Sequence, residues 1–337
     1  PPAAIGGRLD LVGWDFERCG AVALDGQWLM QPGVLARPDD LLVAGRQAVL
    51  AVEQPGIWNR MKGIQSAAGD SWNGLIAEGK GCATSQLVIV LPAEAAGRPL
   101  GLRISHVYTA YQLFVNGRLQ AGNGQVSCEA DGSRAQYLPQ TVFFNPLNGV
   151  PNSFSHGNLA LTLQVSNHHH RKGGLSESVL LGRPQDLQPL RERRLMSEML
   201  IVGILLIIGL YHVLIHLLRF KERSAVLFAL ACFILCLRTL LMGERILYLI
   251  FPQFPWVLGQ TLDYLTITCF LPVFTWFIYE QFPGQLHRQV LRAVFVLSGL
   301  FTLVIIVTPP TVFTHLLAPF NMIMIICGIF ILTAVIK

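Results

Sequence analysis

Five long apolar runs in the second half of the sequence constrain the fold more than any other feature. They cover residues 196–218, 224–242, 256–279, 290–308 and 311–336. At about 1.5 Å per residue, a helix of about 20 residues crosses a hydrocarbon layer of about 30 Å. Because lipid offers the backbone no hydrogen-bonding partner, each run is predicted to be a transmembrane helix. An all-α polytopic bundle is therefore expected over residues 191–337.

The charged residues are concentrated in the first half of the chain. Residues 1–194 contain 17 of the 25 Lys and Arg and 15 of the 20 Asp and Glu, in a sequence that is 52% apolar. This distribution excludes both a single water-soluble globule and a disordered protein. The net charge of +5 is divided between the two halves. No concentrated basic surface therefore indicates nucleic acid, and membrane lipid is the expected partner of the second half.

The first half has the pattern of an all-β domain. Between Leu9 and about Leu187, short segments of alternating polarity are separated by Gly, Pro, Asn and Asp. The clearest strand pair is 110–115 and 118–121, joined by Asn116 and Gly117, which both tolerate positive φ. Further strands are expected at 86–91, 100–104, 159–165 and 178–181. We therefore predict a jelly-roll sandwich with its own core over residues 1–190.

A sandwich of this kind exposes a face or an edge cleft on which a ligand can bind. Aromatic, amide, His and Arg side chains suit sugar or polyol hydroxyls through stacking and hydrogen bonds. A place in the core is the competing interpretation for each aromatic residue, since alternating Tyr and Phe in strands are usually buried. The candidate ligand-binding residues are Trp58, Tyr108, Tyr111, Asn167, His169 and Arg171.

Catalytic, metal and cofactor sites are not indicated. The sequence has no G-x-S-x-G, no H-E-x-x-H and no phosphate-binding glycine loop, so no enzyme is predicted. In an extended segment only His168 and His170 could share a metal, which makes a weak site. His212 and His216 have the i, i+4 spacing of haem or metal ligands, but no second pair matches them, and packing is the favoured interpretation. The pairing of Cys19, Cys82 and Cys128 is left open.

Charged residues inside the apolar runs are costly and need partners. Arg238 and Asp263 lie within the second and third runs, and Glu244 and Arg245 follow the second. Two interpretations remain open for Arg238: a contact with Asp263 or a carbonyl that holds helices together, or a part in signalling. Rearrangement of a polar pair inside lipid is a two-state event, so these four residues are our candidates for signal transmission.

Short basic loops indicate the orientation, because positive residues favour the cytoplasmic side. The loop after the first run contains Arg219, Lys221 and Arg223, and Arg288 follows the third run, whereas Arg245 is alone on the other side. The first half is therefore predicted to lie outside the cytoplasm. The basic residues before the first run argue the other way, namely Arg191, Arg193 and Arg194.

Several motifs in the second half resemble a known family. They are Leu210-Tyr211-His212, the basic loop 219–223, Arg238, Gly243-Glu244-Arg245 and Phe251-Pro252. In this order they resemble the bacterial seven-transmembrane receptors with diverse intracellular signalling modules. The first half resembles the galactose-binding-like jelly roll that precedes such receptors and occurs in the sugar-binding domains of some glycosidases. Its matching segments are 24–28, 110–117, 165–167 and 173–175.

The resemblance implies a multi-pass receptor of the bacterial inner membrane with its jelly roll in the periplasm. A carbohydrate-like or other small ligand, or a protein partner, would bind there, and homodimerisation is left open. Two further helices and a cytoplasmic output module, such as a diguanylate cyclase, histidine kinase or adenylate cyclase, are expected beyond Lys337. The alternative is a membrane-tethered carbohydrate-binding or docking module that transfers no signal. A transporter or haem enzyme is disfavoured, because the apolar runs hold too few polar residues to line a path.

Overall fold

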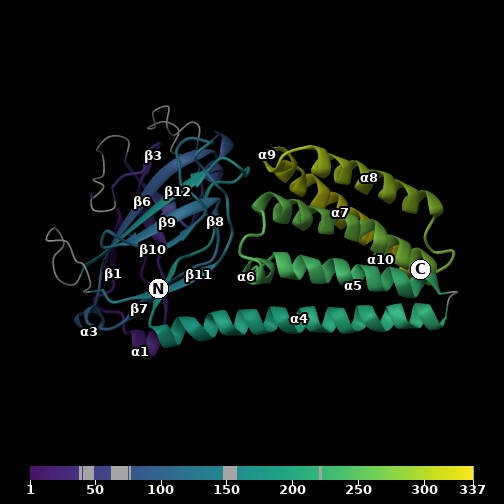
Figure 1. Ribbon diagram of the computed structural model, residues 1–337, viewed down its shortest axis with the longest axis horizontal. Coiled ribbons are helices and arrows are strands. Elements are labelled where there is room, and N and C mark those ends of the chain that lie inside the picture. Colours follow the sequence, from purple (N-terminus) through teal and green to yellow (C-terminus); the bar gives the residue numbers. More distant parts are fainter. Residues whose placement is uncertain are drawn as a thin grey trace. The chain divides into compact units, whose positions relative to one another are not determined.

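The computed structural model describes residues 1–37, 40, 49–61, 75, 77–146, 158–219 and 222–336. The chain divides into two compact units, Pro1–Arg193 and Arg194–Lys337. Figure 1 draws strands throughout the first unit and helices in the second. The predicted fold class is confirmed: an all-β unit is followed by a bundle of apolar helices.

Three sheets build the first unit. The largest has the order β10-β9-β12-β6-β3-β4, with β1 parallel to β6; a second has the order β11-β7-β14-β2, and a small third has β5-β13-β8. The strands of the first sheet are β1 (Arg8–Asp10), β3 (Gly26–Pro32), β4 (Leu50–Gln54), β6 (Gly81–Val90), β9 (Ala110–Val115), β10 (Arg118–Asn123) and β12 (Asn158–Asn167). Those of the other two are β2 (Val22–Ala23), β7 (Leu100–Ile104), β11 (Gln140–Phe144) and β14 (Leu180–Gly182), then β5 (Gly56–Ile57), β8 (Val107–Tyr108) and β13 (Gly174–Leu175). Short helices α1 (Phe16–Cys19), η1 (Trp58–Arg60) and α3 (Ala93–Ala96) lie between strands.

One apolar core joins the two larger sheets. Leu87 on β6 and Leu163 on β12 are fully buried with Leu102 on β7 and Leu181 on β14. The predicted hairpin is confirmed: β9 and β10 are antiparallel, and Asn116 and Gly117 have φ of 48° and 80°. Alternate residues along the strands of the two large sheets therefore contribute to the core, as expected for a sandwich.

The long strands β6 and β12 extend beyond the predicted segments because their outer faces are polar but still buried. Gln86 Nε2 donates to Asp40 O at 3.0 Å, and Gln164 Nε2 donates to Ala36 O at 2.8 Å. The Ala36 amide donates to Thr84 Oγ1 at 2.9 Å. The segment that contains Ala36 and Asp40 covers these polar groups, and the hydrogen bonds replace those that the groups would make to water. This part of the sheet face is therefore covered and offers no open sugar-binding surface.

The second unit contains the apolar helices. Its elements are α4 (Pro184–Leu218), which begins in the first unit, α5 (Arg223–Leu241), α6 (Ile246–Ile250), α7 (Trp256–Gln281), α8 (Arg288–Val307), α9 (Pro310–Phe313), η2 (Thr314–Leu316) and α10 (Leu317–Ile336). Within the residues that the structure describes, five segments are long and apolar enough to cross a membrane: Pro184–Leu218, Arg223–Leu241, Trp256–Gln281, Arg288–Val307 and Pro310–Phe330. The expected fifth run is not one helix, since α9 and η2 precede α10.

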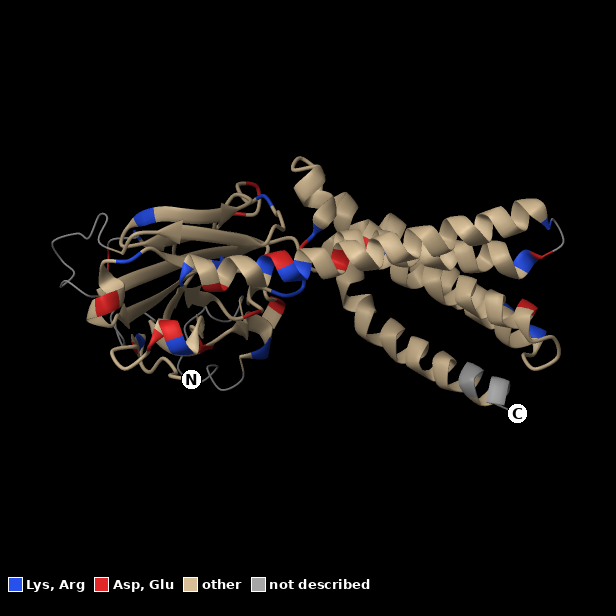
Figure 2. Cartoon of the chain, turned by 90° about the horizontal axis from the view of Figure 1, so that it is seen from below, with Lys and Arg blue, Asp and Glu red and all other residues tan. Residues whose placement is uncertain are grey.

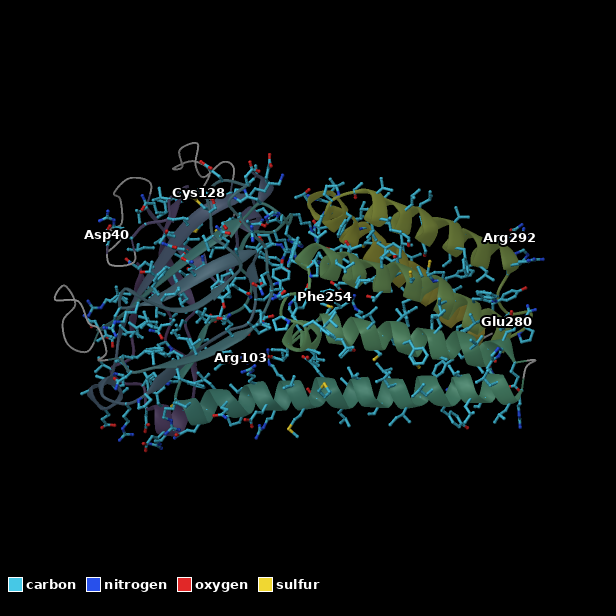
Figure 3. The ribbon with its side chains drawn as sticks, in the orientation of Figure 1. Asp40, Arg103, Cys128, Phe254, Glu280 and Arg292 are labelled. Atoms are coloured by element: carbon cyan, nitrogen blue, oxygen red, sulfur yellow. A yellow bond between two sulfur atoms is a disulfide. The ribbon has the colours of Figure 1, made fainter. Side chains whose placement is uncertain are left out.

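Most charged residues of the bundle lie towards its two ends. Figure 2 shows Lys, Arg, Asp and Glu near both ends of the bundle and uncharged residues along its middle. Glu280 and Arg292 lie at one end and Phe254 at the other (Figure 3). The end with Arg292 is also where α4 ends and α5 begins, so Arg219 and Arg223 belong to it. Arg194, Arg238 and Arg245 belong to the opposite end, so the described part of the bundle has cations at both ends.

Candidate functional site

Polar side chains of α5 and α7 meet inside the membrane unit. Arg238 Nη1 donates to Asp263 Oδ1 at 2.9 Å, and it lies 3.3 Å from Asp263 O and 3.4 Å from Thr266 Oγ1. Thr266 Oγ1 donates to the Asp263 carbonyl at 2.6 Å. The contact between Arg238 and Asp263 considered from the sequence is thus an ion pair between two helices. Removal of one partner would leave the other charge uncompensated in a medium of low dielectric constant.

The turn between α5 and α6 is bound by a carboxylate from the first span. The Glu244 amide donates to both carboxylate oxygens of Glu198, at 3.0 and 3.1 Å. Gly243 has a φ of 61°, and a Cβ at this position would overlap the Glu198 carboxylate. Glycine is therefore required here both by the backbone conformation and by the close approach of α4. Glu244 itself is only 4% exposed.

The four candidate transmission residues thus gather at two neighbouring contacts. Arg245 has a φ of 56°, and its Nη1 donates to Leu241 O at 3.2 Å, at the end of α5. Sequence reasoning missed Glu198, although it is the only acidic residue in the first apolar run. An isolated carboxylate in such a run needs a donor, and this signal would have identified it.

The first turn of α4 is anchored on the β unit. Arg183 forms two hydrogen bonds with Asp186, at 2.8 and 3.1 Å, and lies 3.8 Å from Glu17 on α1. Leu187 is fully buried, with Gly101 and Gly182 against its side chain. The helix therefore begins as a packed part of the sandwich before it continues as the first span.

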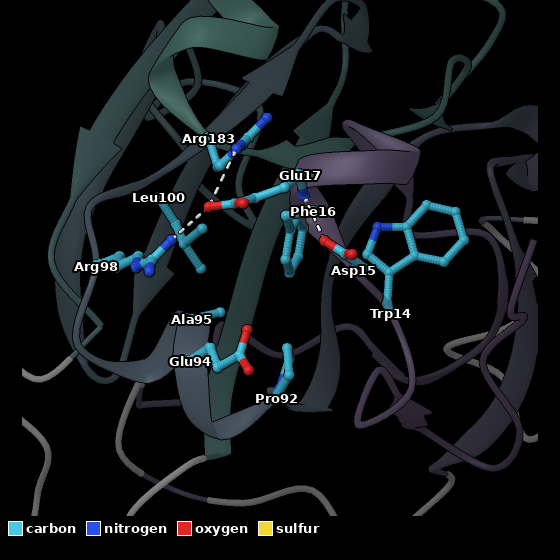
Figure 4. Close-up of a pocket in the computed structure, with 10 residues that line it drawn as sticks. All are labelled: Trp14, Asp15, Phe16, Glu17, Pro92, Glu94, Ala95, Arg98, Leu100 and Arg183. Atoms are coloured by element: carbon cyan, nitrogen blue, oxygen red, sulfur yellow. Dashed lines mark hydrogen bonds and ion pairs between the residues drawn. The ribbon is translucent and has the colours of Figure 1, made fainter.

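A small pocket lies beside this anchor (Figure 4). Glu17 accepts a hydrogen bond from Arg98 Nη1 at 2.7 Å, so the arginines that line the pocket are paired with carboxylates. Its lining residues are Trp14, Asp15, Phe16, Glu17, Pro92, Glu94, Ala95, Arg98, Leu100 and Arg183. These paired charges hold α1, α3 and α4 together, so we assign the pocket a structural role.

Three of the six candidate ligand residues lie inside the β unit. Tyr111 is in the apolar core, burial raises its pKa, and its hydroxyl has no partner among the described residues. Trp58 is buried against Gly173 and Gly174. Asn167 is fully buried, and its amide donates to the carbonyls of Gly79, His170 and Lys172. These three residues support the loops around them and do not face the solvent.

The other three candidates are partly exposed: Tyr108 ends β8, and His169 and Arg171 lie in the loop after β12. Tyr108 stacks on His170 with ring centroids 4.6 Å apart, and His106 and Tyr137 extend this aromatic group. His169 Nε2 is 3.0 Å from Ser133 O. Arg171 follows directly, and its carbonyl accepts from Asn59 Nδ2 at 3.2 Å. We refer below to Tyr108, His106, Tyr137 and His170 as the aromatic group.

A disulfide links the neighbouring loop to the large sheet. Cys82 on β6 is bonded to Cys128, and Figure 3 labels Cys128 in the loop after β10. His168 Nε2 lies 3.2 Å from Ser127 O in the same loop. Burial lowers the pKa of His168, and the nearby positive charges of His169 and Lys80 add to this effect. Of the three cysteines considered from the sequence, Cys19 is exposed and unpaired.

Ligand sets for a metal ion are absent from the described residues. His212 Nδ1 bonds to Ile208 O at 2.9 Å, and its ring packs against Phe228. His216 Nδ1 bonds to Glu222 O at 3.1 Å. Each of the two histidines, although spaced i, i+4, therefore makes its own local hydrogen bond to a backbone carbonyl.

Comparison with known proteins identifies the membrane unit. Residues 194–337 match the family described as 7TM diverse intracellular signalling. The resemblance inferred from the sequence is thereby confirmed. The match covers the membrane unit alone, less than half of the chain, and points to a membrane sensory receptor. With its five apolar helices, the chain is a multi-pass membrane protein. No curated protein matches the chain.

Solved structures of glycosidases match about half of the chain at low identity. A β-glucuronidase of Faecalibacterium prausnitzii is 16% identical, with a TM-score of 0.34, over 48% of this chain and 31% of its own. A β-galacturonidase from Eisenbergiella tayi, bound to glycerol, is 14% identical, with a TM-score of 0.31, over 48% and 24%. A β-galactosidase from Bacteroides fragilis is 17% identical, with a TM-score of 0.31, over 48% and 22%. The chain thus spans less than a third of each of these enzymes.

Proposed function

We propose that the protein is a signalling receptor of the bacterial inner membrane, with its β unit in the periplasm. The β unit would bind a carbohydrate-like ligand, or alternatively a protein partner, near Tyr108, His169 and Arg171. The helical bundle would pass the resulting change to a cytoplasmic output module. Ligand binding shifts such a bundle only by its differential affinity for two arrangements, which is commonly about 1–3 kcal/mol.

One observation carries this proposal: α4 is held by contacts at two points about three turns apart. Its first turn is anchored on the β unit by Arg183, Asp186 and Leu187. About three turns later, Glu198 holds the amide of Glu244 at the end of α5. A continuous helix transmits displacement and rotation along its axis, and α4 continues through Pro189 between these two contacts. A change at the anchor would therefore act on the contact at Glu198 and, next to it, on Arg238 and Asp263.

Two features support the orientation. Arg219, Arg223, Arg288 and Arg292 lie at one end of the bundle, as expected for the cytoplasmic end. The disulfide between Cys82 and Cys128 suits an oxidising compartment such as the periplasm. Both features support a periplasmic position for the β unit.

Cys19 provides a test of the orientation, because it is the exposed free cysteine of the described β unit. Intact spheroplasts that express the chain are treated with a maleimide reagent that does not cross membranes. Cys19 is expected to react in the intact cells, and a Cys19→Ser variant serves as the control. A second variant combines Cys19→Ser with His287→Cys, at the loop between α7 and α8, and should react only after permeabilisation. The reverse labelling pattern would refute the periplasmic assignment.

Signal transfer is tested against the tethered-module alternative. If the protein only docks a ligand and transfers no signal, a single unrelated helix can replace the bundle without loss of function. If the proposal holds, this replacement abolishes the response, whereas the β unit keeps its ligand affinity. A response that survives the replacement would refute the proposal.

A further inference from the structure

Three segments converge beside the aromatic group and are joined by hydrogen bonds to their backbone carbonyls. The Trp58 amide donates to Gly173 O at 2.9 Å, and Asn59 Nδ2 donates to Arg171 O at 3.2 Å. Asn167 Nδ2 donates to Gly79 O at 2.6 Å. The Trp58 amide and the side chains of Asn59 and Asn167 therefore hold the segments near residues 59, 79 and 171 together.

These loops bring positive side chains together. Arg60 and Arg171 both act on Lys172, and with burial they lower its pKa. Lys80, on the second loop, is paired with Glu78 at 3.1 Å. Among the described residues, Arg60, Arg171 and Lys172 have no ion pair with a carboxylate. We call these three residues the cationic cluster.

Two details separate the cationic cluster from ordinary solvated surface charges. Arg171 Nε is buried and has no hydrogen-bonding partner among the described residues. Lys172 is partly buried, with Nζ 5.9 Å from the centroid of the Tyr108 ring. A ring face attracts a cation but does not neutralise it. The site therefore has unmatched positive charge and an unused donor, both held in place by the fold.

The pocket beside the α4 anchor shows the opposite arrangement. There Arg98 and Arg183 are matched by Glu17 and Asp186. The same β unit thus neutralises its arginines where they have a structural part. Convergence of like charges without this compensation favours an anionic ligand, because such a ligand would relieve their repulsion.

We infer that the cationic cluster binds the acidic group of an acidic saccharide, a carboxylate or a sulfate ester. This inference rests on the proposed function, in which a carbohydrate-like ligand binds near Tyr108, His169 and Arg171, and it adds the charge of that ligand. An Arg guanidinium binds such oxyanions through a planar fork, and a Lys ammonium acts as a point charge. The aromatic group beside the cluster supplies a weakly hydrated border that strengthens the electrostatic contact.

The test uses the full chain in nanodiscs of zwitterionic lipid, so that anionic lipid does not compete. Binding is measured by isothermal titration with four probes: a galacturonate oligosaccharide, a sulfated heparin-derived oligosaccharide, a neutral maltooligosaccharide of similar length, and inorganic sulfate. We expect at least one acidic oligosaccharide to bind more tightly than both the neutral oligosaccharide and sulfate. Its affinity should decrease as salt increases.

Charge-neutralising variants locate the binding. Arg171→Gln and Lys172→Gln should each weaken the acidic oligosaccharide by about tenfold or more, since each removes a charged hydrogen-bond donor. Arg118→Gln, at an exposed position on β10, is the matched control and should leave the affinity unchanged. Thermal unfolding of each variant verifies that the β unit is folded.

The outcomes distinguish this inference from the proposal on which it rests. If the wild type bound the neutral and the acidic oligosaccharides equally tightly, and neither variant weakened the acidic ones, the acidic class would be overturned while sugar binding remained intact. Absence of binding by both acidic oligosaccharides would overturn the inference. Equally tight binding of inorganic sulfate would overturn the assignment to a saccharide. Orientation and signal transfer are tested separately, by Cys19 labelling and by replacement of the bundle.

Discussion

The two units of this protein obtain their structure in different ways. In the β unit, apolar side chains from both large sheets form one buried core, and even the outward polar residues of β6 and β12 are hydrogen-bonded. In the membrane unit, 39% of an apolar 18-residue segment of α7 is buried within the protein, against 11% of the corresponding segment of α4. Lipid accepts apolar surface, so a membrane helix need not bury it against protein. The few polar contacts therefore determine more of the arrangement in the membrane unit than in the β unit.

The largest difference between the two units is expected when a core side chain of the β unit is removed. Trp28 is fully buried, and its Nε1 donates to Leu24 O at 2.9 Å. Trp28→Ala should lower the free energy of unfolding of the β unit by about 3–5 kcal/mol, through lost burial and a cavity. Chemical denaturation in detergent, followed by the circular dichroism of the β-sheet, measures this loss.

The matched control for Trp28 lies in the membrane unit. Leu210 on α4 is an exposed apolar residue, and Leu210→Ala should change stability by no more than about 0.5 kcal/mol. A similar loss for both substitutions would show that the two units depend equally on apolar packing.

The ion pair between α5 and α7 should give the next largest effect. Arg238→Met leaves the Asp263 carboxylate without its partner, and we expect a loss of about 3 kcal/mol in the stability of the bundle. The double variant Arg238→Met with Asp263→Leu should recover at least half of this loss, because no uncompensated charge remains. Thermal unfolding in detergent micelles gives both values.

Arg292→Met, at an exposed end of α8, is the control for this cycle and should have almost no effect. Additive losses in the double variant would mean that Arg238 and Asp263 contribute independently. In that case the ion pair would not hold α5 and α7 together.

A smaller, local effect is expected at the contact between α4 and the α5–α6 turn. Glu198→Gln replaces a charged acceptor by a neutral one, which should weaken the hydrogen bond from the Glu244 amide by about 1–2 kcal/mol. Hydrogen–deuterium exchange of that amide should then be about tenfold faster. Ser197→Ala, at the adjacent exposed position, is the control and should not alter the exchange. Unchanged exchange in Glu198→Gln would exclude a contact that couples α4 to the turn.

The smallest predicted effect concerns the pH dependence of the β unit. Burial lowers the pKa of His168 in the folded protein below its ordinary value of 6.5. Below pH 6.5 the unfolded chain therefore binds more protons than the folded one, and stability should decrease as the pH falls towards the folded pKa. Thermal unfolding between pH 7.5 and 5 measures this decrease, which should be smaller in His168→Gln. An identical pH profile for that variant would show that other groups cause the acid sensitivity.

Local patterns were sufficient to predict several elements. The hairpin at Asn116 and Gly117 was predictable because two adjacent residues with positive φ determine the turn. The segment 100–104 was predicted with its observed bounds for a related reason, since it is short, apolar and bordered by turn residues. The apolar runs were predictable because hydrophobicity over about 20 residues determines whether a helix enters lipid.

The candidate ligand residues show where prediction from local pattern failed to separate buried from exposed positions. Tyr111 and Tyr108 are three residues apart in similar sequence surroundings, yet Tyr111 lies in the core and Tyr108 in the aromatic group. Asn167 was a candidate ligand residue, but its side-chain amide donates hydrogen bonds to three loop carbonyls. Such assignments depend on which segments cover a residue, and those segments come from distant parts of the chain.

The amino-acid sequence by itself determined the division into a β half and a membrane half, the approximate spans and the positions of the charges within them. These properties follow from side-chain hydrophobicity and backbone preferences, which act over a few residues at a time. Tertiary structure decided that Cys82 bonds to Cys128, that Glu198 holds the turn after α5, and that Arg60, Arg171 and Lys172 converge. Each of these contacts joins residues far apart in the chain, so it exists only once folding has brought their segments together.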